Sequence, residues 1–327
     1  MSKPKLAPLV SIVVPCFRSS QWLDQLASEI KQAMAEAEFS YELILVNDCS
    51  PDDTWNTIQN IAAIDENVRG IDLVFNTGQY RSTICGLLQT HGEIIVTTDD
   101  DLQQPPSELP KLIQTLLDND NTDCVIASFD NKKHNLLRNL GSGIMDVLFR
   151  VIYKKPRGIR STSMRAMRRP LVTAISEYST INPNINPLIF QTTNRIMSVP
   201  VEHQQRVAGN SGYGILRLIT LMIDNVVSVS TLPLKCISMI GFLAALASFV
   251  LGTYYVLQYF FTDHIKSDTG FMTQVLLIIF FGGTTLFAIG LLGEYIIRIM
   301  EEVRGRPRFV IRQTTTVESP NDPSVEA

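Results

Sequence analysis

Cysteine pairs and the common phosphate-binding signatures are missing from this chain of 327 residues. The five cysteines are scattered, odd in number and never arranged as C-x-x-C: Cys16, Cys49, Cys85, Cys124 and Cys236. This pattern indicates neither a disulfide framework nor a zinc site. No G-x-G-x-x-G follows the first apolar segment, and no Walker A lysine is present. The chain therefore lacks the phosphate-binding loops that dinucleotide-dependent oxidoreductases and P-loop hydrolases use.

Histidine, the commonest general base, is also scarce. Four histidines occur, one before an expected strand, two in polar stretches and one between long apolar segments: His91, His134, His203 and His264. We expect none of them to be catalytic.

Charge is absent from two long segments near the C-terminus. Residues 237–261 and 271–293 contain no Asp, Glu, Lys or Arg over 25 and 23 positions. Each is long enough to cross about 30 Å of hydrocarbon at about 1.5 Å per residue. Two buried globular helices are the alternative, but core helices of this length normally keep a polar face. The sequence therefore predicts two transmembrane helices.

Basic residues around these segments predict their orientation. The linker at 262–268 holds a single lysine, whereas the flanks are basic: Arg217, Lys235, Arg298, Arg304, Arg306 and Arg308. Because positive residues stay on the cytoplasmic side, both termini are expected in the cytoplasm and the linker outside. Residues 9–15 are too short and too β-branched for a secretory signal, so no leader is expected.

Short apolar segments alternate with helical patterns over the first hundred residues. Strands are expected at 9–15, 41–48, 68–76 and 93–101, and helices at 21–37, 52–66 and 81–91. This alternation predicts an α/β fold with a mostly parallel, doubly wound sheet and a ligand crevice at the carboxyl ends of the strands. Four residues mark those strand ends: Pro15, Asp48, Asn76 and Asp99.

Asp99, Asp100 and Asp101 concentrate negative charge where the fourth strand is expected to end. Two unit charges about 4 Å apart repel by roughly 4 kcal/mol at an effective dielectric near 20. On an extended segment Asp99 and Asp101 point the same way, so they can share one cation while Asp100 faces elsewhere. Hard oxygen ligands suit Mg²⁺ or Mn²⁺, which completes its shell with water and phosphate oxygens. The implied ligand is a nucleoside diphosphate.

Two segments after residue 130 indicate contact with a membrane or with phosphate groups. Residues 132–169 hold eleven Lys or Arg and one acid, Asp146. The segment is either a solvated helix face or a surface attracted to anionic lipid or a phosphate-bearing substrate. Residues 213–230 place four polar side chains on one helical stripe: Arg217, Thr220, Asp224 and Ser228. This pattern is typical of an amphipathic helix lying in the interface.

Six ordered motifs together resemble the family 2 glycosyltransferases of the dolichol-phosphate-mannose-synthase type: SIVVPCF, LILVNDCSPDDTW, FNTGQ, TTDDDLQQPP, RVAGNSGYGILRL and GEYIIRIMEEVRGRPRF. Within this family the chain is most similar to bacterial polyprenyl-phosphate glycosyltransferases with two C-terminal spans, which glucosylate undecaprenyl phosphate. The resemblance covers nearly the whole chain. It implies a GT-A type nucleotide-sugar-binding domain and a multi-pass protein of the bacterial cytoplasmic (inner) membrane.

The resemblance and the hydropathy pattern together give expected domain boundaries. A GT-A glycosyltransferase domain is expected at 1–209, interfacial amphipathic helices at 210–234, a two-helix transmembrane domain at 235–299 and a cytoplasmic tail at 300–327. The tail sequence RPRFVIRQ can add a strand to a sheet edge in a neighbouring subunit, so a homo-oligomer is expected.

The resemblance also implies roles for individual residues. The uridine pocket would be lined by Pro15 and Asp48, with Asn76, Gly78 and Gln79 nearby. The metal and the donor diphosphate would be bound by Asp99 and Asp101, with Gln103 as a further ligand. Arg206, Ser211 and Tyr213 would sit over the active site. The acceptor phosphate would be received by Arg138 and by residues 160–166, which include Ser163, with Arg206 and Ser211 assisting.

Three positions depart from the family pattern. Arg18 and Ser19 stand where many relatives have Asn-Glu, and Ile159 stands where relatives often have Asp. The contacts at these positions, and part of the donor preference, are therefore not implied by the resemblance.

The expected reaction is metal-dependent transfer of glucose from a UDP-sugar to undecaprenyl phosphate, which the family resemblance implies to be inverting. A polyprenyl phosphate has a second pKa of about 6, so it is a dianionic nucleophile at neutral pH and demands no general base. Alternatives are another donor, such as GDP-mannose or a UDP-aminosugar, and a non-catalytic membrane-anchored sensor or scaffold. A processive polysaccharide synthase is disfavoured because Trp22 and Trp55 are the only tryptophans, which leaves no Q-x-x-R-W motif.

Structural roles remain alternatives for several of these residues. Asp48 can close an Asx turn, and Asp52 or Asp53 can cap a helix. Arg138 and Arg206 can be ordinary surface arginines.

Overall fold

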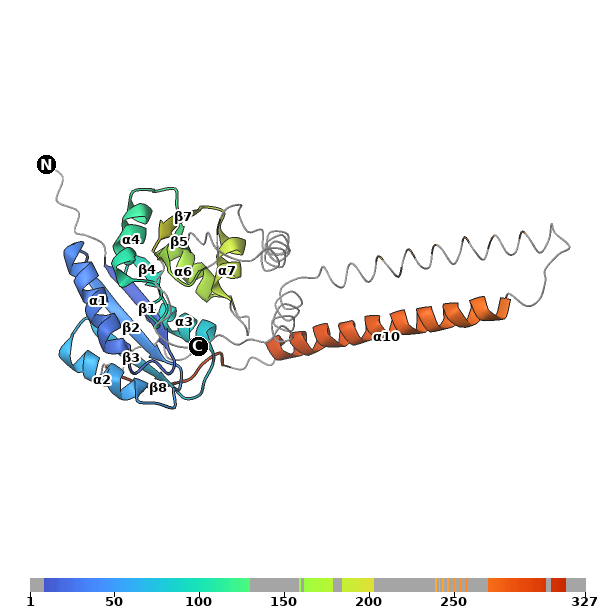
Figure 1. Cartoon of the computed structure of the whole chain (residues 1–327), viewed down its shortest axis with the longest axis horizontal. Coiled ribbons are helices and arrows are strands. Elements are labelled where there is room, and N and C mark those ends of the chain that lie inside the picture. Colours follow the sequence, from blue (N-terminus) through green and yellow to red (C-terminus); the bar gives the residue numbers. More distant parts are fainter. Residues whose placement is uncertain are drawn as a thin grey trace. The chain divides into compact units, whose positions relative to one another are not determined.

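The computed structural model describes residues 9–129, 159, 162–178, 184–202, 270–303 and 307–315, with seven isolated positions between 239 and 257 (Figure 1). The chain forms two compact units, one comprising residues 1–210 and 307–327 and the other residues 211–306. Each unit is described by itself.

The first unit is an α/β domain. Its described strands are β1 (Val10–Cys16), β2 (Tyr41–Asn47), β3 (Val68–Leu73), β4 (Ile94–Thr97), β5 (Cys124–Phe129), β6 (Arg165–Arg168), β7 (Ile196–Val201) and β8 (Ile311–Thr314). Its described helices are α1 (Leu23–Glu36), α2 (Thr54–Ile64), α3 (Gln79–Leu88), the short 3₁₀ helix η1 (Pro106–Glu108), α4 (Leu109–Leu117), α6 (Arg169–Ser176) and α7 (Ile185–Thr192).

The strands form one mixed sheet in the order β7-β5-β6-β4-β1-β2-β3-β8. The central strands β4, β1, β2 and β3 are parallel, and β5 is parallel to β7. Two strands run against their neighbours, β6 against β4 and β5, and β8 against β3. The predicted mostly parallel sheet of an α/β fold is confirmed.

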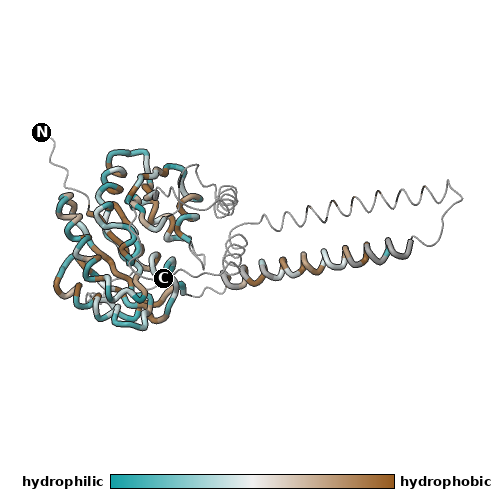
Figure 2. The backbone as a smooth tube through the Cα atoms, in the orientation of Figure 1, coloured by the Kyte–Doolittle hydropathy of each residue, from teal (hydrophilic) through white to brown (hydrophobic). Residues whose placement is uncertain are grey.

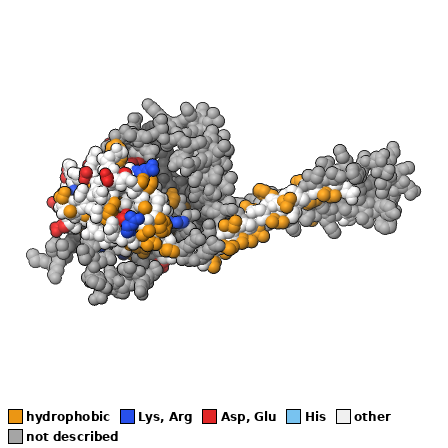
Figure 3. Space-filling model, turned by 90° about the horizontal axis from the view of Figure 1, so that it is seen from below, with side chains coloured by type: hydrophobic (Ala, Val, Ile, Leu, Met, Phe, Trp, Pro, Cys, Tyr) orange, Lys and Arg blue, Asp and Glu red, His pale blue; other side chains and the backbone are white. Residues whose placement is uncertain are grey.

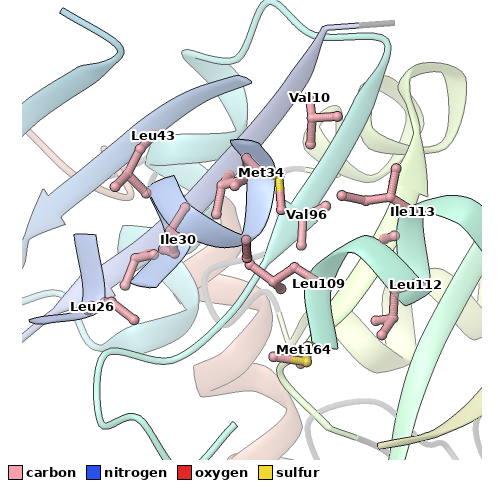
Figure 4. Packing of buried hydrophobic residues seen from close by; sticks show 14 of the residues in the cluster. Val10, Leu26, Ile30, Met34, Leu43, Val96, Leu109, Leu112, Ile113 and Met164 are labelled. Carbon is pink, nitrogen blue, oxygen red and sulfur yellow. The ribbon is translucent and has the colours of Figure 1, made fainter. Parts of the chain in front are cut away.

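Both faces of the sheet are buried, as the apolar strand sequences require. In β1, Ile12 and Val14 pack into the core on one face, and Val13 packs into the core on the other. The first core lies under α1, α2 and α4 (Figure 4). The second lies under α3, α6 and α7. Figure 2 shows the hydrophobic strands inside a more hydrophilic outer layer.

The helices cover the sheet through apolar stripes. In α1, Leu23, Leu26, Ile30 and Met34 are buried, at the spacing of three or four residues that places side chains on one helix face. In α4, Leu109, Leu112, Ile113 and Leu116 are buried with the same spacing.

The fourth strand is shorter than the sequence predicted. β4 ends at Thr97, so the expectation that Asp99 to Asp101 continue an extended strand was wrong. The β1 ladder pairs with β4 only as far as Thr97, and Leu102 adopts a positive φ of 55° as the chain turns. The three carboxylates therefore lie in the loop that follows the strand.

The C-terminal tail forms the predicted strand, but within its own chain. β8 pairs antiparallel with β3, and Val74 N donates to Val310 O at 2.9 Å. The structure thus places the tail on the sheet edge of the same subunit, whereas the sequence analysis had named the edge of a neighbouring subunit as one that the tail can join. The edge of β3 is covered, which removes a row of unpaired backbone groups.

The second unit contains α10 (Gly270–Val303), a helix of 34 residues. Its segment Phe280–Ile297 has a mean hydropathy of 1.5 and none of it is buried in the chain. Among the described residues this is the one helix long and apolar enough to cross a membrane, and it coincides with the second predicted span. Figure 3 shows mostly hydrophobic described side chains along it. The first predicted span, apart from isolated positions, and the amphipathic helix at 213–230 lie outside the described residues.

Candidate active site

Asp48, at the end of β2, organises the loop before α3. The residue is 3% exposed, and its carboxylate accepts three hydrogen bonds: from Thr77 N at 2.7 Å, from Thr77 Oγ1 at 2.8 Å and from Gly78 N at 2.8 Å. Asn76 Nδ2 donates to the Asp48 carbonyl at 3.2 Å. Asp48 thus fixes the loop that carries Asn76 and Gln79. The preceding residue, Asn47, holds the loop after β2, since its Oδ1 accepts from Ser50 N at 3.2 Å.

Gly78 has backbone angles of φ 85° and ψ 156°, a region essentially reserved for glycine. No atom lies within 4 Å of the position that a Cβ would take. We expect Gly78→Ala to cost roughly 1–3 kcal/mol through backbone strain alone. Urea unfolding followed by the fluorescence of Trp22 and Trp55, both packed on the core of the α/β domain, measures this cost.

Gly283→Ala is the matched control, since this helical glycine also faces open space. Equal urea midpoints for wild type and Gly78→Ala would show that the loop relaxes without strain.

Asp52 has a structural role in the loop before α2, but it is not the helix cap that the sequence left as an alternative. Its carboxylate accepts hydrogen bonds from Thr54 Oγ1 at 2.6 Å and Ser20 Oγ at 3.0 Å, and it also bonds Ser50 Oγ. Burial opposes ionisation, but these hydrogen bonds outweigh it and lower the pKa of Asp52 to about 2. Asp53 stands at the N-cap of α2 without a side-chain capping bond.

Of the three acidic residues, Asp99 has side-chain hydrogen bonds to the largest number of other described side chains. Gln79 Nε2 donates to its Oδ1 at 2.6 Å, Ser163 Oγ donates to its Oδ2, and Gln104 Nε2 approaches Oδ2 at 3.3 Å. Ser163 also accepts from Gln104 Nε2 at 2.7 Å. The hydroxyl of Ser163, which the resemblance assigned to the acceptor phosphate, therefore holds Asp99.

The other two carboxylates take different partners. Asp100 accepts a hydrogen bond from Phe17 N at 3.1 Å, so it faces the loop after β1, away from the partners of Asp99, as predicted. Asp101 accepts from Gln103 N at 3.2 Å and from the Gln103 side-chain amide. The side-chain amide nitrogen of Gln103 thus lies against the Asp101 carboxylate.

Burial and mutual repulsion oppose ionisation of this triplet. Burial raises the pKa of Asp99, the charge of Asp101 adds to the increase, and Ser163 and the Arg165 guanidinium reduce it. Burial likewise raises the pKa of Asp100 to about 6, against the hydrogen bond from Phe17. A cation at this point would relieve an unfavourable concentration of charge.

The donor atoms available here fit a hard divalent cation. Asp99, Asp101 and Gln103 would supply two carboxylates and one amide oxygen, which is an all-oxygen set of ligands. Among the residues that the structure describes, no three His, Cys, Asp or Glu side chains form a metal-binding group. Such a cation would therefore complete its shell with water or substrate oxygens, as Mg²⁺ usually does.

A cavity of about 180 Å³ lies beside Asp99. It brings together the ends of β1, β4 and β6 with the first turns of α3 and α7, and its polar lining includes Gln79, Thr98, Asp99, Arg165 and Asn186. Pro15 also lines it, whereas Asp48 does not. Predicted residues from three of the six motifs, Pro15, Gln79 and Asp99, thus meet there with Ser163 of the segment 160–166.

Four predicted residues lie outside the described part of the chain: Arg138, Arg206, Ser211 and Tyr213. Their roles stay predictions. Arg165 and Asn186 also line the cavity and were not singled out from the sequence. Arg165 lies inside the segment 160–166 but is buried on β6, and Asn186 is one of several asparagines in a segment without a recognisable pattern.

Comparisons with known proteins identify relatives over nearly the whole chain. Residues 11–175 match the family described as glycosyl transferase family 2. The chain is 32% identical over 313 residues to an undecaprenyl-phosphate 4-deoxy-4-formamido-L-arabinose transferase of Proteus mirabilis, covering 95% of each protein. A protein of the same description from Klebsiella pneumoniae strain 342 is 32% identical, with 96% of this chain and 97% of the relative covered.

Solved structures also match, at lower similarity. Glucosyl-3-phosphoglycerate synthase from Mycobacterium tuberculosis, in complex with Mn²⁺, UDP and glucosyl-3-phosphoglycerate, has a TM-score of 0.48 and 17% identity, covering 68% of this chain and 78% of that one. Mannosyl-3-phosphoglycerate synthase from Rubrobacter xylanophilus has a TM-score of 0.48 and 16% identity, covering 70% and 74%.

Proposed function

Since the chain belongs to glycosyltransferase family 2, we propose that it transfers a sugar from a nucleotide diphosphate to the phosphate of a polyprenyl lipid, undecaprenyl phosphate. The observation that carries this proposal is the match to undecaprenyl-phosphate sugar transferases over 95% of both chains. The predicted GT-A type fold and the convergence of Asp99, Gln79 and Pro15 at one cavity agree with it.

The relatives change the donor sugar that we expected from the sequence. We expected glucose, whereas the relatives are described as 4-deoxy-4-formamido-L-arabinose transferases. A UDP-linked aminosugar of this acylated type is therefore our first candidate donor, and UDP-glucose the second.

Asp99 and Asp101 would hold Mg²⁺ or Mn²⁺ together with the donor diphosphate, with Gln103 as a further ligand. The cation supplies charge neutralisation for the departing nucleoside diphosphate when it is bound. Gln79, Ser163 and Gln104 orient Asp99 through their hydrogen bonds. The nucleophile needs no general base, because a polyprenyl phosphate with a second pKa of about 6 is mostly dianionic at neutral pH.

A lipid acceptor gives a reason for the chain to carry a membrane-spanning segment. A lipid phosphate lies at the bilayer surface, so an anchored enzyme searches a plane and meets its acceptor at a higher effective concentration. The apolar segment Phe280–Ile297 supports a location in the bacterial inner membrane. The basic residues that flank the apolar segments support our placing the α/β unit on the cytoplasmic side.

The test is transfer by the purified full-length chain in detergent with undecaprenyl phosphate, Mn²⁺ or Mg²⁺, and a panel of UDP- and GDP-sugars. We expect a lipid-linked product from a UDP-sugar. Product from GDP-mannose alone would overturn the donor class, and metal-dependent donor binding without any lipid product would favour a sensor.

The acidic triplet also predicts a pH-dependent effect of metal on stability. Burial raises the pKa of Asp99, a proposed metal ligand, so its contribution to stability is present below about pH 4 and is lost as pH rises through its raised folded-state pKa. A bound cation offsets this loss only where the carboxylates are ionised. We expect Mn²⁺ to raise the Tm more at pH 7.5 than at pH 5, measured by the fluorescence of Trp22 and Trp55.

The Asp99→Asn, Asp101→Asn double variant is the control and should lose the Mn²⁺ effect at both pH values. An equal rise in Tm at pH 5 and pH 7.5 would argue against metal binding by these carboxylates.

A further inference from the structure

A β-bulge in the C-terminal strand aims two successive side chains at one buried carboxylate. The register of β8 against β3 shifts between Asp72 and Leu73, and Arg312 is the extra residue on β8. Arg312 Nη1 and Gln313 Nε2 both lie 3.4 Å from Asp72 Oδ2. Successive residues of a regular strand point to opposite faces, whereas a bulge re-aims a side chain. The bulge therefore allows both residues to donate to Asp72, which is 1% exposed.

Asp72 in turn orients the side-chain amide of Asn47, the last residue of β2. Asn47 Nδ2 donates to Asp72 Oδ1 at 2.7 Å, and Asn47 Oδ1 accepts from Ser50 N at 3.2 Å. A carboxylate accepts hydrogen bonds and donates none, so it holds the amide nitrogen and leaves the amide oxygen for the loop after β2. Asn47 is 2% exposed, so water does not replace these bonds.

Ser50 connects the loop after β2 to the loop after β1. Its Oγ accepts from Arg18 N at 2.7 Å, and the neighbouring Phe17 N donates to Asp100 Oδ2 at 3.1 Å. Cys49 and Arg18 have positive φ angles of 50° and 57°, which are uncommon for such side chains. Backbone in this region persists where the surrounding contacts hold it. Hydrogen bonds thus connect the C-terminal strand to both loops beside the acidic triplet.

We propose, on the basis of the function proposed above, that Arg312 is a positioning residue for the nucleoside diphosphate. Through Asp72 and Asn47 it holds residues 48–52 in the conformation that binds the donor. Asp48 in this range fixes the loop before α3 through its carboxylate. Since β8 follows α10 in the sequence but belongs to the α/β unit, donor binding depends on residues beyond the apolar C-terminal helix.

A role in stability alone is the alternative, because β8 also covers the edge of β3. Stability alone predicts that a folded variant binds UDP as wild type does. Positioning predicts weaker UDP binding by the folded variant. It also predicts energetic coupling between Arg312 and Asn47, whose side chains both contact Asp72.

The test measures the Kd of UDP by calorimetry in Mn²⁺ with the purified full-length chain in detergent. Arg312→Met and Asn47→Ala should each weaken UDP binding by about tenfold or more. The double variant should bind within about threefold of the weaker single variant, because both changes break the same hydrogen-bond network. Asn47→Ala leaves the pair of Arg312 and Asp72 in place, so it tests the proposal even where Arg312→Met does not fold.

Two further variants separate positioning from stability. Arg312→Lys keeps a cation beside Asp72 and should bind UDP within about threefold of wild type. Met34→Ala, in the last turn of α1, opens a cavity in the core and should lower the urea midpoint without changing the Kd of UDP (Figure 4).

Hydrogen exchange without nucleotide gives a second readout. The amides of residues 48–52 should exchange faster in Arg312→Met and Asn47→Ala than in Met34→Ala, because only the first two changes release this loop.

Wild-type UDP affinity in folded Arg312→Met or Asn47→Ala would overturn the inference, as would losses of affinity that add in the double variant. Binding of UDP by wild type without transfer of any sugar to undecaprenyl phosphate would instead overturn the proposed function, because the binding comparison needs no lipid.

Discussion

Replacement of Asp99 by Asn is expected to lower the rate of sugar transfer to undecaprenyl phosphate by about 100-fold or more. Gln79 and Ser163 both donate to the Asp99 carboxylate, so an amide loses one acceptor oxygen as well as the charge that would bind the metal. Asp101→Asn should have a similar effect, because it removes the second carboxylate of the same oxygen set.

Stability measurements separate this effect from unfolding. Burial raises the pKa of Asp99, so the ionised carboxylate is unfavourable in the metal-free fold, and Asp99→Asn should unfold at the same or a slightly higher urea concentration. Asp24→Asn, an exposed carboxylate on α1, is the matched control and should transfer sugar normally. Full transfer by Asp99→Asn would remove this residue from the active site.

Replacement of Arg312 by Met is expected to destabilise the α/β unit by about 2 kcal/mol. Asp72 on β3 is 1% exposed, and Arg312 of β8 approaches its Oδ2 at 3.4 Å while donating to Val74 O at 2.9 Å. Methionine keeps the apolar stem that covers β3 but leaves the buried carboxylate without its cation. Asn47 Nδ2, which donates to Asp72 Oδ1 at 2.7 Å, cannot replace that charge.

Urea unfolding followed by Trp22 and Trp55 fluorescence measures this loss, and a double-mutant cycle with Asp72→Asn assigns it. In the Asp72→Asn background the same Arg312→Met change should cost less than half as much, since no buried charge is left unpaired. Equal costs in both backgrounds would show that Arg312 acts through packing alone.

The fold was largely readable from the sequence because the central strands are continuous apolar runs. β1 and β2 begin and end within one or two residues of the predicted ranges 9–15 and 41–48. Strands of a sheet that is buried on both faces need apolar residues at nearly every position. Because these strands alternate with helical segments along the chain, the sequence predicts that they lie parallel. The crevice at the strand ends followed from this order, and the structure places Pro15 and Asp99 there together.

The errors arose where pairing between distant segments decides the outcome. The end of β4 depends on how far β1 and β6 continue beside it, which no local pattern records. The partner of β8 is β3, more than 200 residues earlier, so the sequence of the tail predicted a strand but not the edge that receives it. Local propensity cannot distinguish an edge in the same chain from one in another subunit.

The candidate active site was also only partly predictable from the sequence. Asp99 and Asp101 were recognisable because three successive acids after an apolar run are chemically unusual. Arg165 and Asn186 have ordinary sequence surroundings, and their place in the cavity wall is revealed by the contact at 3.0 Å that joins β6 to α7. Such contacts between a strand and a distant helix become visible only in three dimensions.

The most direct test of the central claim is lipid-linked product formation during a Mn²⁺ titration of chelator-treated protein. Wild type should be inactive in excess chelator and regain full activity as Mn²⁺ is added, while the Asp99→Asn, Asp101→Asn double variant should stay inactive at every concentration. Full product from the double variant in excess chelator would contradict the assignment of the loop after β4 as the metal and diphosphate site.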